Sequence, residues 1–175
     1  MAFILLMTNY RRKGYVSSPR SWKSLCTLCS RFRDFMQRVH RLNQDPLQGQ
    51  VVVVKKHGLV IGTVCVECNP PRTPIDDIFP DELASLCNSN QSFVYLSSFA
   101  VGSSYRCTRL ALRMLRHIWS SVKEKGFDVG ICVVHPDHAS FYKRFGFTEI
   151  AVSNISGLNQ APAALLVIKR HDVRL

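Results

Sequence analysis

The sequence predicts an α/β fold, in which a mixed, twisted β-sheet of six or seven strands carries helices on both faces. The first observation is the order of elements in and directly after the stretch from Phe93 to Phe147: strand, turn, long helix, strand, short helix, strand. The second is the length of 175 residues, which is typical of one domain with its own core and needs no disulfide or metal for stability. We therefore expect a single domain over residues 1–175.

The central elements follow from apolar spacing. Residues 93–101, FVYLSSFAV, have the composition and length of a buried strand that ends before Gly102. Apolar residues then recur at helical spacing up to Gly126, and they are Leu110, Ala111, Met114, Leu115, Ile118 and Val122. Residues 127–134 predict a second buried strand, and residues 135–147 predict a short helix and a turn into another strand.

The flanking segments supply further elements. Residues 1–7 are apolar but too short to span a bilayer and lack a preceding positive segment, so we expect an edge strand. Residues 21–39 predict an amphipathic helix with a basic outer side. Two strand-like runs flank His57-Gly58 and indicate a hairpin, and a Pro-rich loop at 69–77 precedes a short helix around Glu82 to Leu86. Residues 161–170 predict a closing strand.

The charge and the cysteines limit the partners and the location. With 23 Lys and Arg against 12 Asp and Glu, the net charge of +11 favours an anionic partner: a nucleic acid, a membrane surface, a phosphate-bearing cofactor or an acidic protein. Seven cysteines without a secretion signal predict reduced thiols in the cytoplasm. The pairs Cys26/Cys29 and Cys65/Cys68 have zinc-like spacing but lie on helix and strand patterns, so we expect no metal site.

The turn after the strand at 93–101 is a candidate anion site. The start of a long helix presents backbone N–H groups and partial positive charge, which suit a phosphate or pyrophosphate, and Arg106 adds a cation. Most such turns bind nothing, so this signal alone is weak. Cys107 lies beside Arg106 and Arg109, where the pKa of a thiol is lowered, although inert packing is the alternative.

The combined motifs resemble the core of the GNAT superfamily of N-acyltransferases. In that family a strand ending in Val leads into an Arg/Gln-x-x-Gly-x-Gly/Ala loop, and a later segment carries Asn or His, then Tyr, then Gly-Phe. The matching residues are Val101, Arg106, Arg109 (in place of the first loop glycine) and Ala111, followed by His135, Pro136, His138, Tyr142, Gly146 and Phe147. The resemblance, strongest over 51–150, implies a sheet that splits between two central parallel strands and admits an acyl carrier arm.

One subgroup is still more similar: the long-chain N-acyl amino acid synthases, which are related to the acyl-homoserine-lactone synthases. Their Gly-Thr strand, Pro-rich link, Pro-x-Glu-Leu helix, "SRFAV" strand and Pro-x-His-x-x-Phe-Tyr segment are matched in order by Gly62-Thr63, residues 70–74, residues 80–83, residues 97–101 and residues 136–142. The resemblance implies transfer of a fatty acyl group from an acyl carrier protein or coenzyme A thioester to the amino group of an amino acid.

The same resemblance implies roles for individual residues. Backbone at Val101 would bind the thioester carbonyl, the turn of Ser103, Ser104, Arg106, Cys107 and Arg109 would hold the carrier phosphate, and Tyr142 would protonate the leaving thiolate. The subgroup often has a Glu in the strand before Ala-Val, where this chain has residues 95–98. Candidates for the base are therefore Tyr95, Ser97 and His138 acting through a water. His138 and Tyr142 also have structural alternatives, which are loop hydrogen bonding for the histidine and packing on the core for the tyrosine.

Two other functions remain open at this stage. One is an acetyl-coenzyme A N-acetyltransferase of a small amine or a protein, and the other is a catalytically silent GNAT-fold binding module. Arg106, Arg109, Arg113 and Arg116 follow at steps of three, four and three, which predicts one basic helical face. Such a face would suit an acidic acyl carrier protein, or would simply be solvated. We expect no nucleic-acid partner and no transmembrane segment, whereas the charge permits peripheral membrane contact.

Overall fold

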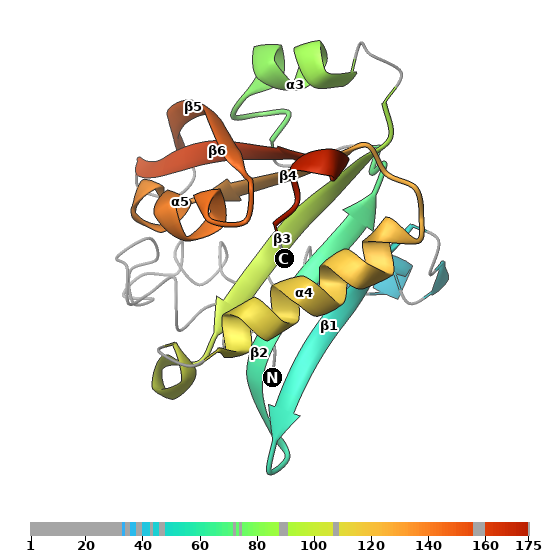
Figure 1. The fold of residues 1–175 in the computed structure, drawn as a ribbon, viewed down its shortest axis with the longest axis vertical. Helices are drawn as coiled ribbons and strands as arrows, with labels where there is room; N and C mark the ends of the chain where they lie inside the picture. The colour runs from blue at the N-terminus through green and yellow to red at the C-terminus, as the bar shows by residue number, and fades with distance from the viewer. Residues whose placement is uncertain are drawn as a thin grey trace.

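The computed structural model describes residues 33, 36–37, 40–42, 44–45, 48–71, 73, 75–87, 91–106, 109–155 and 160–174. Within them one sheet runs in the order β1-β2-β3-β4-β6-β5 (Figure 1). Its strands are β1 (Gly49–Lys56), β2 (Leu59–Cys68), β3 (Phe93–Val101), β4 (Val129–Val134), β5 (Thr148–Ile155) and β6 (Ala161–Lys169). Strands β3 and β4 are parallel and the other neighbours are antiparallel, so the predicted mixed sheet is confirmed.

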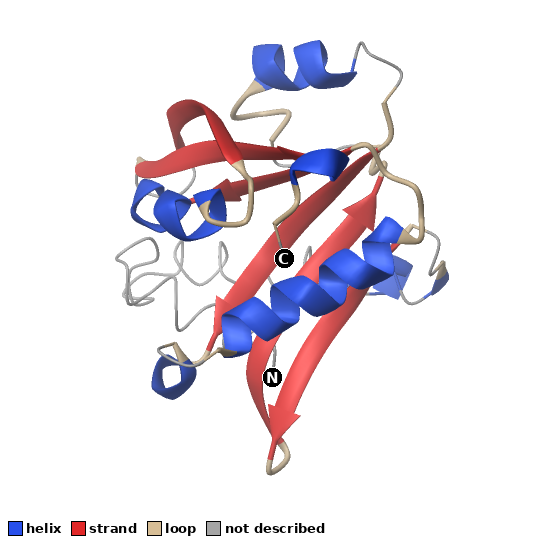
Figure 2. Ribbon diagram, viewed as in Figure 1, coloured by secondary structure: helices blue, strands red, loops and turns tan. Residues whose placement is uncertain are grey.

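The helices and 3₁₀ turns with described bounds are α3 (Pro80–Cys87), η1 (Ser103–Tyr105), α4 (Leu110–Lys123), α5 (Pro136–Lys143) and η3 (Arg170–Asp172). Figure 2 shows α4 lying across β1, β2 and β3. Buried residues of α4 and α5 share one core cluster with Val64, Val66 and Leu96 of the sheet. A second cluster joins Leu83 of α3 to Tyr95 and Ile131. Helices therefore cover both faces of the sheet, as the sequence predicts.

Helix α4 shows how the apolar spacing determines packing. Met114, Leu115, Ile118 and Val122 are buried as predicted, and Trp119 joins them. The predicted basic face needs a correction at its start, because α4 begins at Leu110 with Arg109 as its N-cap residue. Arg106 lies in the turn after η1, so it is not part of a helical face. Arg113 and Arg116 are exposed on α4 itself.

Strands β3 and β4 separate halfway along their length. Their ladder begins at Phe93–Val129 and ends at Leu96–Cys132. Directly beyond, β3 contains a bulge, because Ser98 and Phe99 face the single residue Val64 between the pairs Ser97–Cys65 and Ala100–Thr63. Ser98 has a positive φ of 55°. A bulge bends its strand and increases the local twist, so this insertion turns β3 away from β4.

Several predicted features lie wholly or largely outside the described residues. These are the strand at 1–7, most of the helix at 21–39, the pair Cys26/Cys29, and Cys107. Arg33, Met36 and Gln37, which fall within the predicted helix, are helical. The hairpin at His57-Gly58 and the short helix before residue 87 are present, the latter beginning at Pro80. No helix among the described residues is both long and apolar enough to cross a membrane.

Candidate active site

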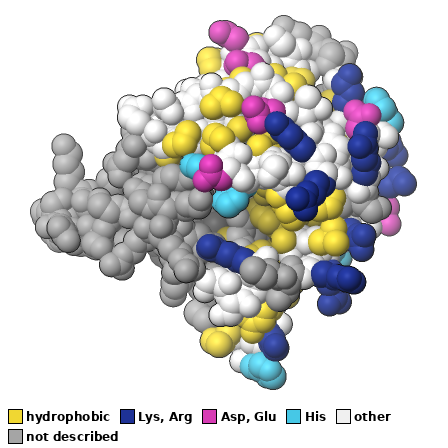
Figure 3. All heavy atoms as spheres, turned by 60° about the vertical axis from the view of Figure 1, so that its left-hand side comes forward, with side chains coloured by type: hydrophobic (Ala, Val, Ile, Leu, Met, Phe, Trp, Pro, Cys, Tyr) yellow, Lys and Arg dark blue, Asp and Glu magenta, His cyan; other side chains and the backbone are white. Residues whose placement is uncertain are grey.

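A cavity of about 410 Å³ lies where β3 and β4 separate. Its volume falls within the range of about 300–1,000 Å³ that is usual for small-molecule sites. Its walls come from β2, β3, β4, α5 and the first turns of α4. The lining residues are Val64, Leu96, Ser97, Ser98, Phe99, Ala100, Val101, Arg106, Ala111, Leu115, Cys132, Val133, Val134, His135, His138, Phe141 and Tyr142. Figure 3 shows the hollowed apolar surface with His, Lys and Arg side chains near it.

Tyr142 is the buried polar side chain of this cavity. Its ring lies among aromatic rings, with centroids 5.3 Å from Phe141, 5.6 Å from Phe147 and 6.3 Å from Phe99. Burial, with a smaller contribution from the neighbouring Cys132, raises the pKa of the Tyr142 hydroxyl well above 10.0. The phenol therefore stays protonated at neutral pH, where it can donate a hydrogen bond or a proton into the cavity.

The Gly-Phe pair after α5 fixes the position of Tyr142. The Phe147 N–H donates to the carbonyl of Tyr142 at 3.4 Å, and the Gly146 N–H donates to the carbonyl of Lys143 at 3.2 Å. These two bonds, with a positive φ of 98° at Gly146, form a Schellman motif. The ring of Phe147 then packs against that of Tyr142, as apolar residues on either side of this motif often do.

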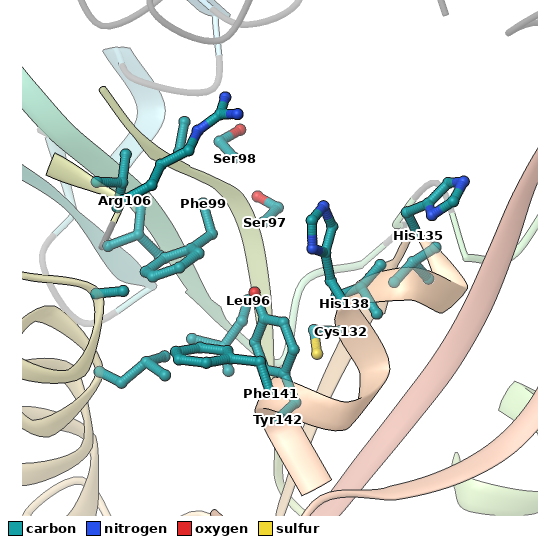
Figure 4. Close-up of a pocket in the computed structure, with 17 residues that line it drawn as sticks. Leu96, Ser97, Ser98, Phe99, Arg106, Cys132, His135, His138, Phe141 and Tyr142 are labelled. Atoms are coloured by element: carbon teal, nitrogen blue, oxygen red, sulfur yellow. The ribbon is translucent and has the colours of Figure 1, made fainter. Parts of the chain in front are cut away.

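The other end of α5 places two histidines. His135 is the N-cap residue of α5, and its Nδ1 accepts a hydrogen bond from the Asp137 N–H at 3.2 Å. Its side chain is only 17% exposed. His138, in the first turn, is exposed and lines the cavity. In Figure 4 its ring points toward Ser97 of β3, across the opening between the separated strands. Ser97 and His138, both predicted as candidates for a base, are thus brought together.

The predicted phosphate loop is only partly at the cavity. Val101 and Arg106 line it, and Figure 4 shows Arg106 at its edge near Ser98. Ala111 places the first turn of α4 on the wall. The side chains of Ser103, Ser104 and Arg109 are exposed and are not among the lining residues, and Cys107 lies outside the described residues. An anion at this edge would meet Arg106 and the N-terminus of α4.

Tyr95 lies elsewhere. It is 6% exposed and packs in the second core cluster with Ile75 and Phe79, on the sheet face opposite Leu96. It does not line the cavity. Side chains alternate between the faces of a strand, so Tyr95 and Leu96 point in opposite directions. Its catalytic role therefore stays a sequence-based prediction.

Several lining residues were not predicted from the sequence. Phe99 and Phe141 form apolar walls, and Cys132 of β4 lies fully buried beside Tyr142. Burial raises the pKa of the Cys132 thiol, which keeps it neutral and weakly nucleophilic. The register of the two parallel central strands would have indicated Cys132, because it is the partner of Leu96 at the last rung of the ladder.

The arrangement suits a reaction at a thioester. The cavity is mainly apolar, and it offers a buried hydroxyl, an imidazole facing a serine, and a cation at its edge. Among the described residues that line it, none is Asp or Glu. Such a set can bind an apolar chain attached to an anionic carrier, protonate a leaving group and accept a proton from a nucleophile.

Comparisons with known proteins agree with the predicted resemblance. The family described as "N-acyl amino acid synthase FeeM" matches residues 1–169. A solved structure of FeeM, an N-acyl amino acid synthase from uncultured soil microbes, has a TM-score of 0.75 at 18% identity and covers 98% of this chain and 84% of that chain. No curated protein matches the sequence.

Two further solved structures are similar to a lesser degree. The NatC complex bound to Gag peptide and CoA gives a TM-score of 0.53 at 20% identity, covering 75% of this chain and 77% of that chain. Escherichia coli ElaA gives 0.50 at 10% identity, covering 69% and 68%. With the sheet order and the separated parallel strands, these likenesses confirm the GNAT fold.

Proposed function

The chain belongs to the FeeM family of N-acyl amino acid synthases, and on that basis we propose that it transfers a fatty acyl group from a pantetheine thioester to the amino group of an amino acid. Membership makes it an N-acyltransferase. The choice of donor and acceptor is the proposal. The observation that supports it most is the cavity between β3 and β4, whose apolar walls surround the Tyr142 hydroxyl.

The size and lining of the cavity favour a long acyl chain. At about 30 Å³ for each water-sized atom group, a volume of about 410 Å³ has room for roughly a dozen heavy atoms. An acetyl thioester would occupy a small part of it. Leu96, Phe99, Leu115 and Phe141 would bury several methylene groups, and each buried methylene contributes about 0.8 kcal/mol.

The chemistry requires a neutral amine, a bound carbonyl and an acid for the sulfur. We assign to His138, whose imidazole faces Ser97 across the opening, acceptance of the proton that the amine nitrogen loses, because a neutral imidazole nitrogen can act as a base. The neutral amine attacks the thioester carbon, the positively charged nitrogen of the intermediate gives its proton to His138, and backbone N–H near Val101 would stabilise the oxyanion. As the carbon–sulfur bond breaks, the Tyr142 hydroxyl gives its proton to the leaving thiolate.

The carrier would approach at the Arg106 edge. Arg106 and the start of α4 would bind its phosphate, and the exposed Arg113 and Arg116 continue the positive charge along α4. Coenzyme A and acyl carrier protein both bring a phosphate to this position. We propose the acyl carrier protein as the physiological donor, because its acidic surface complements cations that lie beyond the phosphate. The NatC structure contains bound coenzyme A, so acyl-coenzyme A is the donor with which acyl carrier protein should be compared.

The test is a transfer assay with purified protein, in which long-chain acyl carrier protein, long-chain acyl-coenzyme A and acetyl-coenzyme A are each offered with amino acids or simple amines. Mass spectrometry should find N-acyl amino acids from the long-chain donors. Tyr142→Phe should lower kcat by 10-fold or more, the usual size of a general-acid effect. Because the pKa of Tyr142 is raised above 10.0, its hydroxyl stays protonated up to pH 10. Any decrease in wild-type kcat as the pH is raised toward 10 must therefore come from another group.

The matched control is Tyr105→Phe, which removes a phenol hydroxyl from η1 outside the cavity lining. It should retain nearly full activity. Full activity of Tyr142→Phe would remove its role as the acid. Transfer of acetyl groups alone would replace the proposed function with acetylation, and no transfer from any donor would favour a catalytically silent module.

A further inference from the structure

The hairpin that joins β1 and β2 projects beyond the rest of the described structure. Lys56 and Leu59 are the last paired residues, and His57 and Gly58 form the turn, with φ of 48° and 76°. Positive φ at both turn positions is typical of a type I′ turn, which continues the twist of the two strands. Figure 1 shows this turn extending past the N-terminal end of α4.

An apolar side chain lies at the tip among cations. Leu59 is 60% exposed, more than any other large hydrophobic side chain in the described part of the chain. Lys55, Lys56 and His57 are exposed beside it. The Lys56 ammonium lies 5.3 Å from the centre of the Tyr105 ring, a cation–π distance that holds the hairpin against η1. The projecting end at the bottom of Figure 3 carries hydrophobic, basic and histidine side chains together.

The charge around the tip has one sign. No Asp or Glu occurs in residues 46–66 or in residues 83–123. These two segments contain β1, the hairpin, β3, η1 and α4, and their Lys and Arg residues are Lys55, Lys56, Arg106, Arg109, Arg113, Arg116 and Lys123. Of these, Lys55 and Lys56 lie on the hairpin and Arg106 and Arg109 lie before α4, so the described residues of these two segments give the hairpin end a positive charge that attracts an anionic surface.

We propose that the tip of the β1–β2 hairpin, defined as residues 55–59, binds anionic lipid membranes, with Leu59 entering the interface and Lys55 and Lys56 lying at the lipid phosphates. A lipid surface fits this tip better than a protein does. Protein partners generally bind over a broad complementary area with buried anchors, whereas an interfacial anchor needs only a projecting apolar group flanked by cations. The choice of residues 55–59 as the membrane-binding site rests only on the exposed apolar and basic side chains of this tip.

The reason for such an anchor rests on the proposed function. A fatty acyl amino acid is an amphiphile that partitions into membranes through its chain. Membrane binding through residues 55–59 would hold the Arg106 edge of the cavity near the bilayer, since Lys56 contacts Tyr105 in the turn that leads to Arg106. The product could then leave for the bilayer without crossing much water. Binding itself would occur whether or not transfer takes place, so the two ideas can be tested separately.

The experiment measures sedimentation of the full chain with vesicles of phosphatidylcholine alone or with added phosphatidylglycerol. We expect binding to the anionic vesicles that falls as salt rises. Leu59→Ser should weaken it about tenfold, as expected for losing the burial of a leucine side chain. Lys55→Gln with Lys56→Gln should weaken it about 25-fold, on the basis of about fivefold per cation at the surface.

The control is Val152→Ser on edge strand β5, which removes an apolar side chain of similar exposure, 58%. It should bind vesicles like the wild type. All these variants should turn over a water-soluble acyl thioester normally. Absence of binding to anionic vesicles would overturn the proposal, and so would equal losses in Val152→Ser and Leu59→Ser. If the tip variants bind vesicles normally but raise the KM for acyl carrier protein, the tip is a protein-binding site and the proposal is wrong.

Discussion

At the scale of single residues, two neighbours determine where the Tyr142 hydroxyl lies. Phe147 packs on the Tyr142 ring, and Gly146 supplies the backbone conformation that brings Phe147 there. A Cβ on Gly146 would collide with the backbone carbonyl of Asp172. The Gly-Phe pair is thus required for two reasons, a left-handed φ and lack of space, and both affect the buried acid.

We expect Gly146→Ala to lower the free energy of unfolding by about 3 kcal/mol or more, because left-handed strain of about 1–2 kcal/mol adds to crowding of about 1–3 kcal/mol. Gly126 is the matched control. Its φ is 73°, yet nothing lies within 4 Å of an added Cβ, so Gly126→Ala should cost only about 1–2 kcal/mol. Urea denaturation measures both values. Equal losses would mean that the contact with Asp172 relaxes freely.

At the scale of elements, the start of α5 depends on an unusual cap. His135 provides the acceptor for the Asp137 N–H, and Pro136 follows at the first helical position, where it needs no hydrogen bond. His135→Ala should destabilise the protein by about 1 kcal/mol, the typical value for loss of an N-cap side chain. His135→Asn should restore most of the stability, because Asn is a favoured cap.

Thermal denaturation of the two variants tests the cap, and their kcat values test its effect on His138 and Tyr142. A capping role predicts that activity follows stability, so the Asn variant should be active. An inactive but stable Asn variant would indicate that the imidazole of His135 takes part in the reaction.

Asp128 ties the starts of the two parallel strands together. Its Oδ2 accepts from the Ser92 N–H at 2.9 Å and from the Ser92 hydroxyl at 2.8 Å, just before β3 and β4 begin. These hydrogen bonds, the backbone bond first, lower the pKa of Asp128 below 3.8, with Arg170 adding a smaller effect. A lowered pKa stabilises the fold above the ordinary carboxyl pKa. That contribution is lost as the pH falls through the lowered value.

Asp128→Asn should therefore reduce the denaturation midpoint at pH 7, and the difference from the wild type should shrink as the solution is acidified below pH 4. Urea titrations at several pH values measure this. Glu124→Gln, which removes an exposed carboxylate just after α4, serves as the control and should give a smaller change. A difference that stays constant down to pH 2 would show that the hydrogen bonds do not depend on ionisation.

At the scale of the whole molecule, the distribution of charge predicts how the donor is selected. Arg113→Glu with Arg116→Glu should raise the KM for acyl carrier protein tenfold or more, chiefly through slower encounter, and added salt should raise the wild-type KM in the same direction. Turnover of a short acyl-pantetheine should hardly change. Steady-state kinetics with both donors at several salt concentrations measure these effects.

The control pair is Lys169→Glu with Arg170→Glu, which changes the same amount of charge at the end of β6, away from the cavity lining. It should leave both donors nearly unaffected. Losses of equal size in the two double variants would show that total charge matters and that α4 is not a docking face. Loss on both donors in the α4 variant would point to damage of the cavity.

The sequence was sufficient where periodicity controls the result. It predicted the buried side of α4 and the hairpin at His57-Gly58, because each depends on local spacing, whereas the parallel central strands were implied by the family resemblance. The predicted basic helical face was wrong at its start. The helical spacing of the arginines continues back to Arg106, but the helix begins only at Leu110. Spacing alone cannot show where hydrogen bonding starts.

The cavity itself was only partly predictable. The resemblance pointed to Tyr142, His138, Val101 and Arg106, all of which line it. Strand alternation would have placed Tyr95 correctly, on the face opposite Leu96. The same rule would have excluded Ser97 from the cavity. Ser97 nevertheless reaches the cavity, because β4 no longer pairs beside it. The bulge at Ser98 could not be predicted locally, because no glycine or proline marks it in the sequence. It depends on pairing with β2, which is distant in the sequence.

Because of the bulge in β3, the cavity depends on the number of residues in this strand. One additional residue between Leu96 and Val101 shifts the register against β2 directly beyond the point where the ladder with β4 ends. Exchanges of side chains in this segment change what the cavity holds, whereas a one-residue deletion would let the central sheet close along its full length and leave no space for a substrate. Natural variation in β3 should therefore be rich in substitutions and free of insertions and deletions, and redesign of this enzyme should keep the length of that strand constant.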